Sequence, residues 1–364
     1  MRRWLPPDPW VFLAFVLLAI YPLIPGLNEG IRLLIDDSLG RGLTTLFIYA
    51  MLALALHMVV GNAGLFHLGI GAFFGLGAYI AGILMVKVPS YPFQLGWIPA
   101  MLLAGFGAAA LGIFLCAPTL RLRGDYLALV TLGFGEVIRF TMRNLDEITG
   151  GTKGLRPVPP PKLPFVADAD WSAEFQPFYF FCLFFLVLTY ILVVNLERSR
   201  IGRSWVALRE DELAASCMGM NTARMKLAAF ALGMFIAGMA GSLYTIRFQD
   251  TADPDFYGFN ISIVILSCLI LGGLGSRQGV LLGVLLIVGW NNIIADILDR
   301  KMQKVLPMES PFLKFGFWKM LAFGLVLVLV MRFRPRGLLP ASREDLSQNR
   351  LDSSRPLTAG GTQA

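Results

Sequence analysis

The sequence is poor in charged residues. Only 15% of its 364 residues are Asp, Glu, Lys or Arg, whereas 56% are hydrophobic. A soluble domain has roughly 25% charged residues, so too little charge is present here to cover a water-soluble fold of this size. The composition excludes an ordinary cytosolic enzyme and a disordered protein. It predicts an integral membrane protein, in agreement with a mean hydropathy of +0.66.

Residues that bind metals or form disulfides are also scarce. The four cysteines lie far apart without CxxC spacing, and the two histidines are His57 and His67. We therefore expect neither a metal site nor a disulfide framework. The GxxxxGK[ST] sequence of a phosphate-binding loop is also missing. We expect this chain to bind no cofactor, to carry no ATPase of its own and to be no enzyme.

Long apolar segments dominate the chain instead. A helix needs about 20 mostly apolar residues to cross a bilayer, in a range of about 17–25. The sequence predicts an all-α, polytopic membrane helix bundle with about ten transmembrane helices. Glycines interrupt segments 64–86 and 258–274, so some helices are expected to be broken or re-entrant. The expected spans are 10–25, 42–60, 64–86, 97–117, 126–143, 177–194, 225–246, 258–274, 279–298 and 314–332.

Basic residues near the ends of these segments predict the orientation. The net charge is +7, and Lys and Arg beside apolar segments are typical of the positive-inside rule rather than of nucleic-acid binding. The densest group lies at 198–209, which places both termini in the cytoplasm and the proline-rich loop 144–176 in the periplasm. Residues 1–340 are expected to form the transmembrane domain, with a cytoplasmic segment at 198–224. Residues 341–364 are expected to be a disordered cytoplasmic tail.

The glycine-rich stretch 61–79 is the first candidate for a mechanistic role. A GxxxG pair within it suits close packing of helices. The same glycines also suit a helix break whose bare backbone lines a polar path. Both interpretations stay open. The candidate path residues in this stretch are Asn62, Gly64, His67, Gly71 and Gly75.

A second candidate is Glu136, the carboxylate most deeply embedded in apolar sequence. Burying it unpaired in a membrane would cost several kcal/mol, so it needs a partner or a polar cavity. Arg139 follows three residues later on the same helix face and can form an ion pair with it. A structural ion pair and a position along the path are equally good interpretations of Glu136 and Arg139.

The stretch 201–220 is too polar to cross a membrane. It resembles a short amphipathic helix or helix pair, which could lie on lipid or dock into a groove of a soluble partner. Small residues and a glycine at 212–219 favour docking, because they allow close contact and a sharp chain reversal. The candidate docking residues are Arg209, Glu210, Glu212, Ala214, Ala215 and Gly219.

From about residue 42 to 342, the chain resembles the LivM-type permease subunits of bacterial branched-chain amino acid ABC importers. The matching motifs occur in the family's order. They are Val60–Tyr79, RLRGDYLALVTLGFGEVIR at 121–139, ITGGTKGL at 148–155, SRIGRSWVALREDELAASCMG at 199–219, LGGLGS at 271–276 and RPRGLLP at 334–340.

This resemblance implies a multi-pass protein of the bacterial inner membrane, embedded in lipid and without a nucleic-acid partner. With a LivH-type subunit it would form the path for branched-chain or other small amino acids. A periplasmic binding protein would deliver the substrate, and two ATP-binding cassette subunits would use the ATP. Residues 212–219 are similar to the EAAxxxG loop through which importer permeases engage their ATPases, with a Leu inserted after the Glu. The segment 198–224 is then the coupling segment.

The sequence leaves two alternative functions open. A urea or short-amide ABC permease would have the same architecture and similar motifs. An ion-coupled secondary transporter would usually have several carboxylates within the membrane, whereas Glu136 is the one convincing case in this sequence.

Overall fold

The computed structural model describes residues 9–20, 38–86, 95–119, 124–159 and 175–290, with isolated positions at 292 and between 324 and 339. Within these residues the chain folds into 12 α-helices, as the all-α prediction requires. They are α1 (Pro9–Ile20), α3 (Ser38–Leu56), α4 (Ile70–Met85), α5 (Trp97–Thr119), α6 (Asp125–Asn144), α7 (Asp146–Thr149), α8 (Phe175–Arg198), α9 (Arg200–Glu210), α10 (Glu212–Cys217), α11 (Thr222–Phe248), α12 (Phe259–Gly272) and α13 (Arg277–Gly289). Short turns of other helix types are η2 (His57–Asn62, π-helical), η3 (Gly151–Lys153) and η4 (Pro254–Tyr257).

The helices have the lengths and apolar character of a polytopic membrane bundle. Five described segments are long and apolar enough to cross a bilayer, and three shorter apolar helices accompany them. The five are Gly42–Asn62, Trp97–Thr119, Phe178–Arg198, Thr222–Phe248 and Pro254–Gly272, and the shorter ones are Trp10–Ile20, Ile70–Met85 and Arg277–Gly289.

Helix α6 covers the expected span 126–143, but its charged residues distinguish it from the five apolar segments. Several other predictions fall partly or wholly outside the described residues. They are most of the span 314–332, the tail 341–364, the ends of the spans 10–25 and 279–298, and the central part of the loop 144–176.

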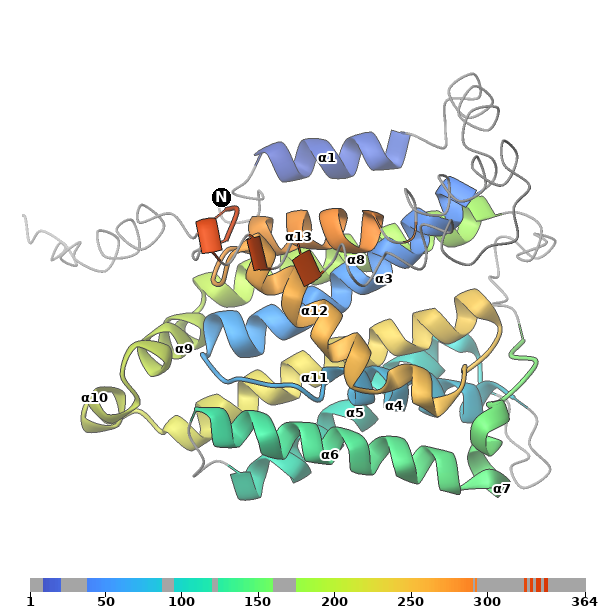
Figure 1. Cartoon of the computed structure of the whole chain (residues 1–364), viewed down its shortest axis with the longest axis horizontal. Coiled ribbons are helices and arrows are strands. Elements are labelled where there is room, and N and C mark those ends of the chain that lie inside the picture. Colours follow the sequence, from blue (N-terminus) through green and yellow to red (C-terminus); the bar gives the residue numbers. More distant parts are fainter. Residues whose placement is uncertain are drawn as a thin grey trace, which may run out of the picture.

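The helices pack as two groups that meet along α3 and α11 (Figure 1). One group contains α1, α3, α8, α12 and α13, and the other contains α4, α5, α6 and α11. Close approach of α4 to α11 depends on glycine. A Cβ at Gly241 would overlap the backbone of Phe74, and a Cβ at Gly77 would overlap the backbone of Gly238. This is the small-residue packing that brings helix backbones together in lipid.

The interruption expected within 64–86 is present. Helix α3 continues into the π-helical turn η2, residues 63–69 are not α-helical, and α4 begins only at Ile70. The other segment expected to be interrupted, 258–274, differs because α12 is continuous. Its glycines stand at the two ends, with Gly258 at the N-cap and Gly272 as the last residue, so they do not break the helix.

Helices α9 and α10 connect α8 to α11 and project from one end of the bundle, which we call the α10 end. Helix α7 lies at the opposite end, the α7 end (Figure 1). The projecting pair is anchored by Trp205, whose side chain is fully buried and whose indole Nε1 donates a hydrogen bond to the backbone oxygen of Met225 at 2.9 Å.

The glycine packing predicts a contrast between two substitutions to alanine. Gly241→Ala forces α4 and α11 apart and should lower the free energy of unfolding by about 1–3 kcal/mol, as overpacking does in other cores. Gly133→Ala, on the exposed face of α6, adds a methyl group with no neighbour within 4 Å and should be neutral or slightly stabilising. Thermal unfolding of the two purified variants measures the difference. Equal stability would contradict the packing described here.

Candidate functional site

Helix α10 is a short, well-capped helix that ends in a reversal. The side chain of Asp211 accepts hydrogen bonds from the backbone N–H groups of Leu213 and Ala214, at 2.8 and 3.1 Å, and so caps the helix. Gly219 follows the helix with φ +83°, a conformation that glycine adopts without steric cost. Asn221 then caps α11 by accepting a hydrogen bond from the backbone N–H of Arg224. Local sequence chemistry thus fixes where α10 begins and where the chain turns back.

The outer surface of α10 is apolar. Leu213 is 65% exposed and Met218 is 84% exposed. Ala214 and Gly219 are exposed as well, whereas Ala215 is buried. Exposed apolar side chains on a projecting polar segment are typical of a protein-binding surface.

Two of the predicted docking residues contact this chain instead. Glu212 forms an ion pair with Lys226, at 2.7 Å between Oε1 and Nζ, and the lysine side chain is only 4% exposed. Arg209 donates a hydrogen bond from Nη1 to the backbone oxygen of Gly61. Glu210 lies exposed at the end of α9. The predicted set therefore divides into the exposed Glu210, Ala214 and Gly219, the buried Ala215, and an inward-facing pair whose side chains contact other residues of this chain, Arg209 and Glu212.

The break between α3 and α4 lies beside this inward-facing pair. Gly64 has φ +70°, and a Cβ placed on it would lie 2.6 Å from Cγ of Arg209. Farther along the non-helical segment, the backbone N–H of Leu68 donates to Oγ1 of Thr131 on α6, at 3.2 Å. Gly69 packs directly on the backbone oxygen of Thr131. The broken segment thus contacts α9 at its start and α6 at its end.

Glu197 binds the same break from α8. Its carboxylate lies 3.1 Å from Nε2 of His57, 3.2 Å from Nδ2 of Asn62 and 2.5 Å from Nη1 of Arg277. The Glu197 side chain is 17% exposed, whereas that of Glu136 is 31% exposed. Glu136 is thus the carboxylate most embedded in apolar sequence, but Glu197 is the more buried of the two in the structure. Glu197 escaped notice because it follows the apolar run directly and stands beside Arg198, where a charged residue is ordinary.

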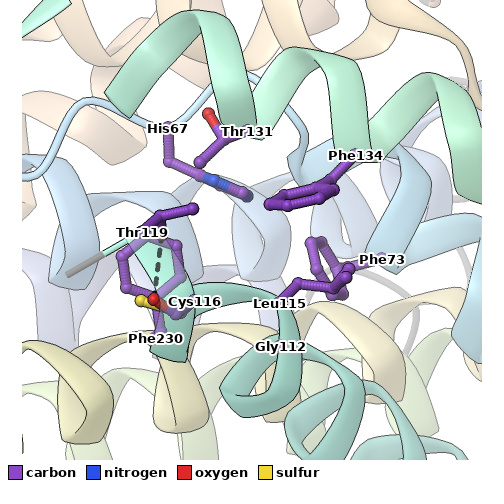
Figure 2. A pocket seen from close by; sticks show the side chains of 9 residues that line it. All are labelled: His67, Phe73, Gly112, Leu115, Cys116, Thr119, Thr131, Phe134 and Phe230. Atoms are coloured by element: carbon purple, nitrogen blue, oxygen red, sulfur yellow. Dashed lines mark hydrogen bonds between the residues drawn. The ribbon is translucent and has the colours of Figure 1, made fainter. Parts of the chain in front are cut away.

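His67 is buried in the broken segment without a polar partner among the described residues. Neither ring nitrogen forms a hydrogen bond, and the ring packs edge-on against Phe230 at 5.2 Å between centroids. Figure 2 shows the imidazole directed toward Phe134 and beside Thr131. The adjoining cavity is about 10 Å³, close to the space that one water molecule requires. Its lining is His67, Phe73, Gly112, Leu115, Cys116, Thr119, Thr131, Phe134 and Phe230.

The candidate glycines of α4 lie in packing contacts. The backbone N–H of Gly71 donates to Oγ of Ser262 on α12 at 3.0 Å. A Cβ on Gly75 would lie 2.5 Å from Cγ of Tyr257 in η4. Both glycines are buried. They let α4 approach α12 and η4, and they are separate from the break itself.

Glu136 and Arg139 form the ion pair that their spacing predicts, at 2.7 Å between Oε2 and Nη2. Arg139 also donates to Asp255 of η4, and Arg143 lies 3.1 Å from the same carboxylate. This charged cluster is toward the α7 end, where it joins α6 to η4. No sequence pattern marked Asp255 as a partner, because it lies 116 residues after Arg139.

The two faces of α6 differ. Leu127, Thr131, Ile138 and Met142 are buried on the face toward the broken segment and α4. The opposite face is exposed in this chain, and its exposed residues recur at helical spacing. They include Tyr126, Leu129, Gly133, Val137 and Phe140.

Comparison with known proteins identifies the family. A sequence profile described as the permease component of the branched-chain amino acid transport system matches residues 38–331. The high-affinity branched-chain amino acid transport system permease protein LivM of Escherichia coli (strain K12) is 36% identical, over 83% of this chain and 70% of that protein. BraD of Pseudomonas aeruginosa is 28% identical over 83% of this chain and 95% of its own length. LivH of Escherichia coli (strain K12) is 26% identical over 82% of this chain and 93% of its own length.

No solved structure matches this chain at a significant level. The profile nevertheless spans most of the sequence, and the identity with LivM exceeds that with LivH. The resemblance inferred from the motifs is confirmed. The chain belongs to the LivM-type permease components of branched-chain amino acid ABC transport systems, which are non-catalytic membrane subunits.

Proposed function

We propose that this chain forms, together with a LivH-type subunit, the membrane path of an ATP-driven importer for branched-chain amino acids. A periplasmic binding protein delivers the amino acid at the α7 end, and two ATPase subunits bind at the α10 end. The observation that carries this proposal is the projecting α10 with its exposed apolar side chains, held by α9, whose Arg209 contacts the segment between α3 and α4, in a chain of this family.

Helix α10, which α9 holds at the tip of the coupling segment, is the docking element for an ATPase. Leu213 and Met218 offer apolar side chains that a groove on the ATPase would bury. The Glu212–Lys226 ion pair and the Asp211 cap hold α10 in place before the partner arrives. A preformed element of this kind loses less conformational entropy on binding. The coupling segment 198–224 thus combines a rigid base with an exposed apolar tip.

The α10 end is cytoplasmic and the α7 end is periplasmic. Arginines at 198, 200, 203, 209 and 224 cluster at the α10 end, as the positive-inside rule requires. The α7 end has charges of both signs instead, with Asp146, Glu147 and Asp253 near Arg143 and Lys153. In this orientation the described part of the loop 144–176 faces the periplasm. The same rule supports cytoplasmic N- and C-termini.

The cysteines of this chain provide a test of orientation and docking. Cys217 on α10 is exposed, whereas Cys116, Cys182 and Cys268 are buried. A membrane-impermeant maleimide should label Cys217 from the cytoplasmic side, and bound ATPase subunits should protect it. In a Cys217→Ser background, Thr152→Cys at the α7 end should react from the periplasmic side. Labelling of both positions from one side would refute the orientation, and unprotected Cys217 in the assembled complex would refute docking at α10.

The exposed face of α6 borders the translocation path. A charged cluster that includes Glu136 and Arg139 is costly against lipid, so a partner subunit or water covers this part of α6. Gly133 on the same face leaves room for a passing solute. Of the break residues, Asn62 and Gly64 contact Glu197 and Arg209, whereas His67 lies beside Thr131 of α6. Gly71 and Gly75 set the position of α4. The ammonium and carboxylate of an amino acid can then pass polar groups without a tight site.

Replacing the carboxylate tests this part of the proposal. Glu136→Gln keeps the side-chain size, and Arg139 keeps its contact with Asp255. We expect normal assembly but uptake lowered by about fivefold or more, the factor that corresponds to about 1 kcal/mol. Glu147→Gln at the α7 end is the matched control and should transport normally. Normal uptake by Glu136→Gln, or equal losses of assembly and uptake, would show that Glu136 has no charged role in the path.

The proposed importer function predicts ATP-driven leucine uptake by the reconstituted complex. Proteoliposomes that contain this chain, a LivH-type subunit and both ATPases should accumulate labelled leucine only with ATP inside and leucine-loaded binding protein outside. Stimulation by urea-loaded binding protein in place of leucine would favour the urea permease. Uptake that needs an ion gradient and no ATP would favour a secondary transporter. Either result would refute the proposed function.

A further inference from the structure

Both ends of α9 are tied to the same six-residue turn, η2. At the beginning, Glu197 stands just before α9 and binds His57 and Asn62 at the two ends of η2. At the other end, Arg209 in the last turn of α9 donates to the backbone oxygen of Gly61. We call Glu197 and Arg209 together the α9 clamp.

Contacts at the start and in the middle of α9 hold this helix as one rigid unit. Ser199 caps it by accepting a hydrogen bond from the backbone N–H of Gly202 at 3.3 Å, and a Cβ on Gly202 would overlap the backbone of Leu196. The buried Trp205 fixes its middle to the first turn of α11. A displacement of α9 therefore moves Arg209 directly, and it reaches Glu197, which lies in the last turn of α8, through the junction at Ser199.

The clamped turn continues α3 in the wider π-helical geometry. Backbone hydrogen bonds of the wide π type join Ala63 to Met58 at 3.3 Å, and Leu65 reaches back to Val59 at 3.1 Å. A single π-helical turn inside an α-helix often marks a functional site, since it holds an extra residue that can shift register. Shortly after this turn, Leu68 and Gly69 contact Thr131 of α6.

The contact of Arg209 is well matched to its acceptor. Gly61 stands at the end of η2, where the last backbone oxygens of a helix lack partners within the helix and attract a cation. Gly64 leaves the space that the aliphatic part of Arg209 occupies, because any Cβ there would meet Cγ and Cβ of the arginine. Two glycines of the break thus fit one side chain of α9.

We propose that the α9 clamp transmits the movement of the docked ATPases to the broken segment 57–69, and through Thr131 to α6. Arg209 and Glu197 are positioning residues for transport, and Arg209 acts through Gly61 rather than by touching the ATPase. This inference rests on the proposed docking at α10. It predicts that removing the clamp separates ATP hydrolysis from uptake while the complex stays assembled.

The experiment compares Arg209→Met with Arg203→Met in the complete importer, reconstituted with leucine and its binding protein. Arg209→Met keeps an aliphatic side chain over Gly64 but removes the donor. Arg203 lies on the same helix, and Nη1 of its guanidinium donates to the local backbone oxygen of Arg198. We expect Arg209→Met to bind the ATPases and hydrolyse ATP normally, with leucine uptake per ATP lowered about tenfold. Arg203→Met should match the unmodified protein, and Arg209→Lys should recover part of the loss.

Other outcomes overturn the inference. Normal uptake per ATP in Arg209→Met would show that the α9 clamp transmits nothing. Loss of the ATPases in Arg209→Met would make the residue a docking contact. If the complex with Arg209→Met fails to assemble, the complex with Arg209→Lys is measured instead. Normal uptake per ATP in Arg209→Lys, combined with failed assembly of Arg209→Met, would show that Arg209 has a structural role alone. Met218→Asp distinguishes failure of the clamp from failure of docking, because it should release the ATPases. Retention of the ATPases would refute docking at α10 and, with it, the clamp. Release of the ATPases together with normal uptake per ATP in Arg209→Met would refute the clamp alone.

Discussion

An interrupted helix inside a membrane must satisfy its own backbone, because lipid offers no hydrogen bonds. In this chain that requirement falls on residues 57–69, and much of the surrounding structure follows from it. Arg209 supplies a donor for Gly61, Thr131 supplies an acceptor for Leu68, and Glu197 fixes the polar side chains at the two ends of η2. The positions of α8, α9 and α6 are therefore coupled to one break in one helix.

Among the described residues, ion pairs stand at the ends of the bundle, and several glycines of α4 and α11 stand between helices. Glu197 with Arg277 joins α8 to α13 at the α10 end, and Arg139 with Asp255 joins α6 to η4 toward the α7 end. Between these clusters, α4 and α11 approach through Gly77 and Gly241. Charge is thus kept where water or a partner can reach it, and backbone contact replaces it in the apolar interior.

The sequence was sufficient for the fold class, the helix break and the Glu136–Arg139 pair, because each depends on neighbours within a turn or on composition. It was insufficient for contacts between distant segments. Asp255 lies 116 residues after Arg139, and nothing in either stretch marks their meeting. Arg209 was assigned to docking because it stands beside the EAA-like motif, yet its side chain turns inward. Only the tertiary structure reveals that direction, because an amphipathic helix can face a soluble partner on one side and the membrane helices on the other, and the sequence does not say which side Arg209 occupies.

The small cavity beside His67 has a mechanical consequence. Dense glycine contacts make α4 and α11 stiff around Gly77 and Gly241, whereas an unwound backbone and a void adjoin the same helices near Phe230. A packing defect yields more easily than a filled interior. The described part of the bundle is therefore packed backbone to backbone around Gly77 and Gly241, whereas beside Phe230 it leaves room for about one water molecule. A side chain beside this cavity can change rotamer without displacing a helix, which the backbone contacts at Gly77 and Gly241 do not allow.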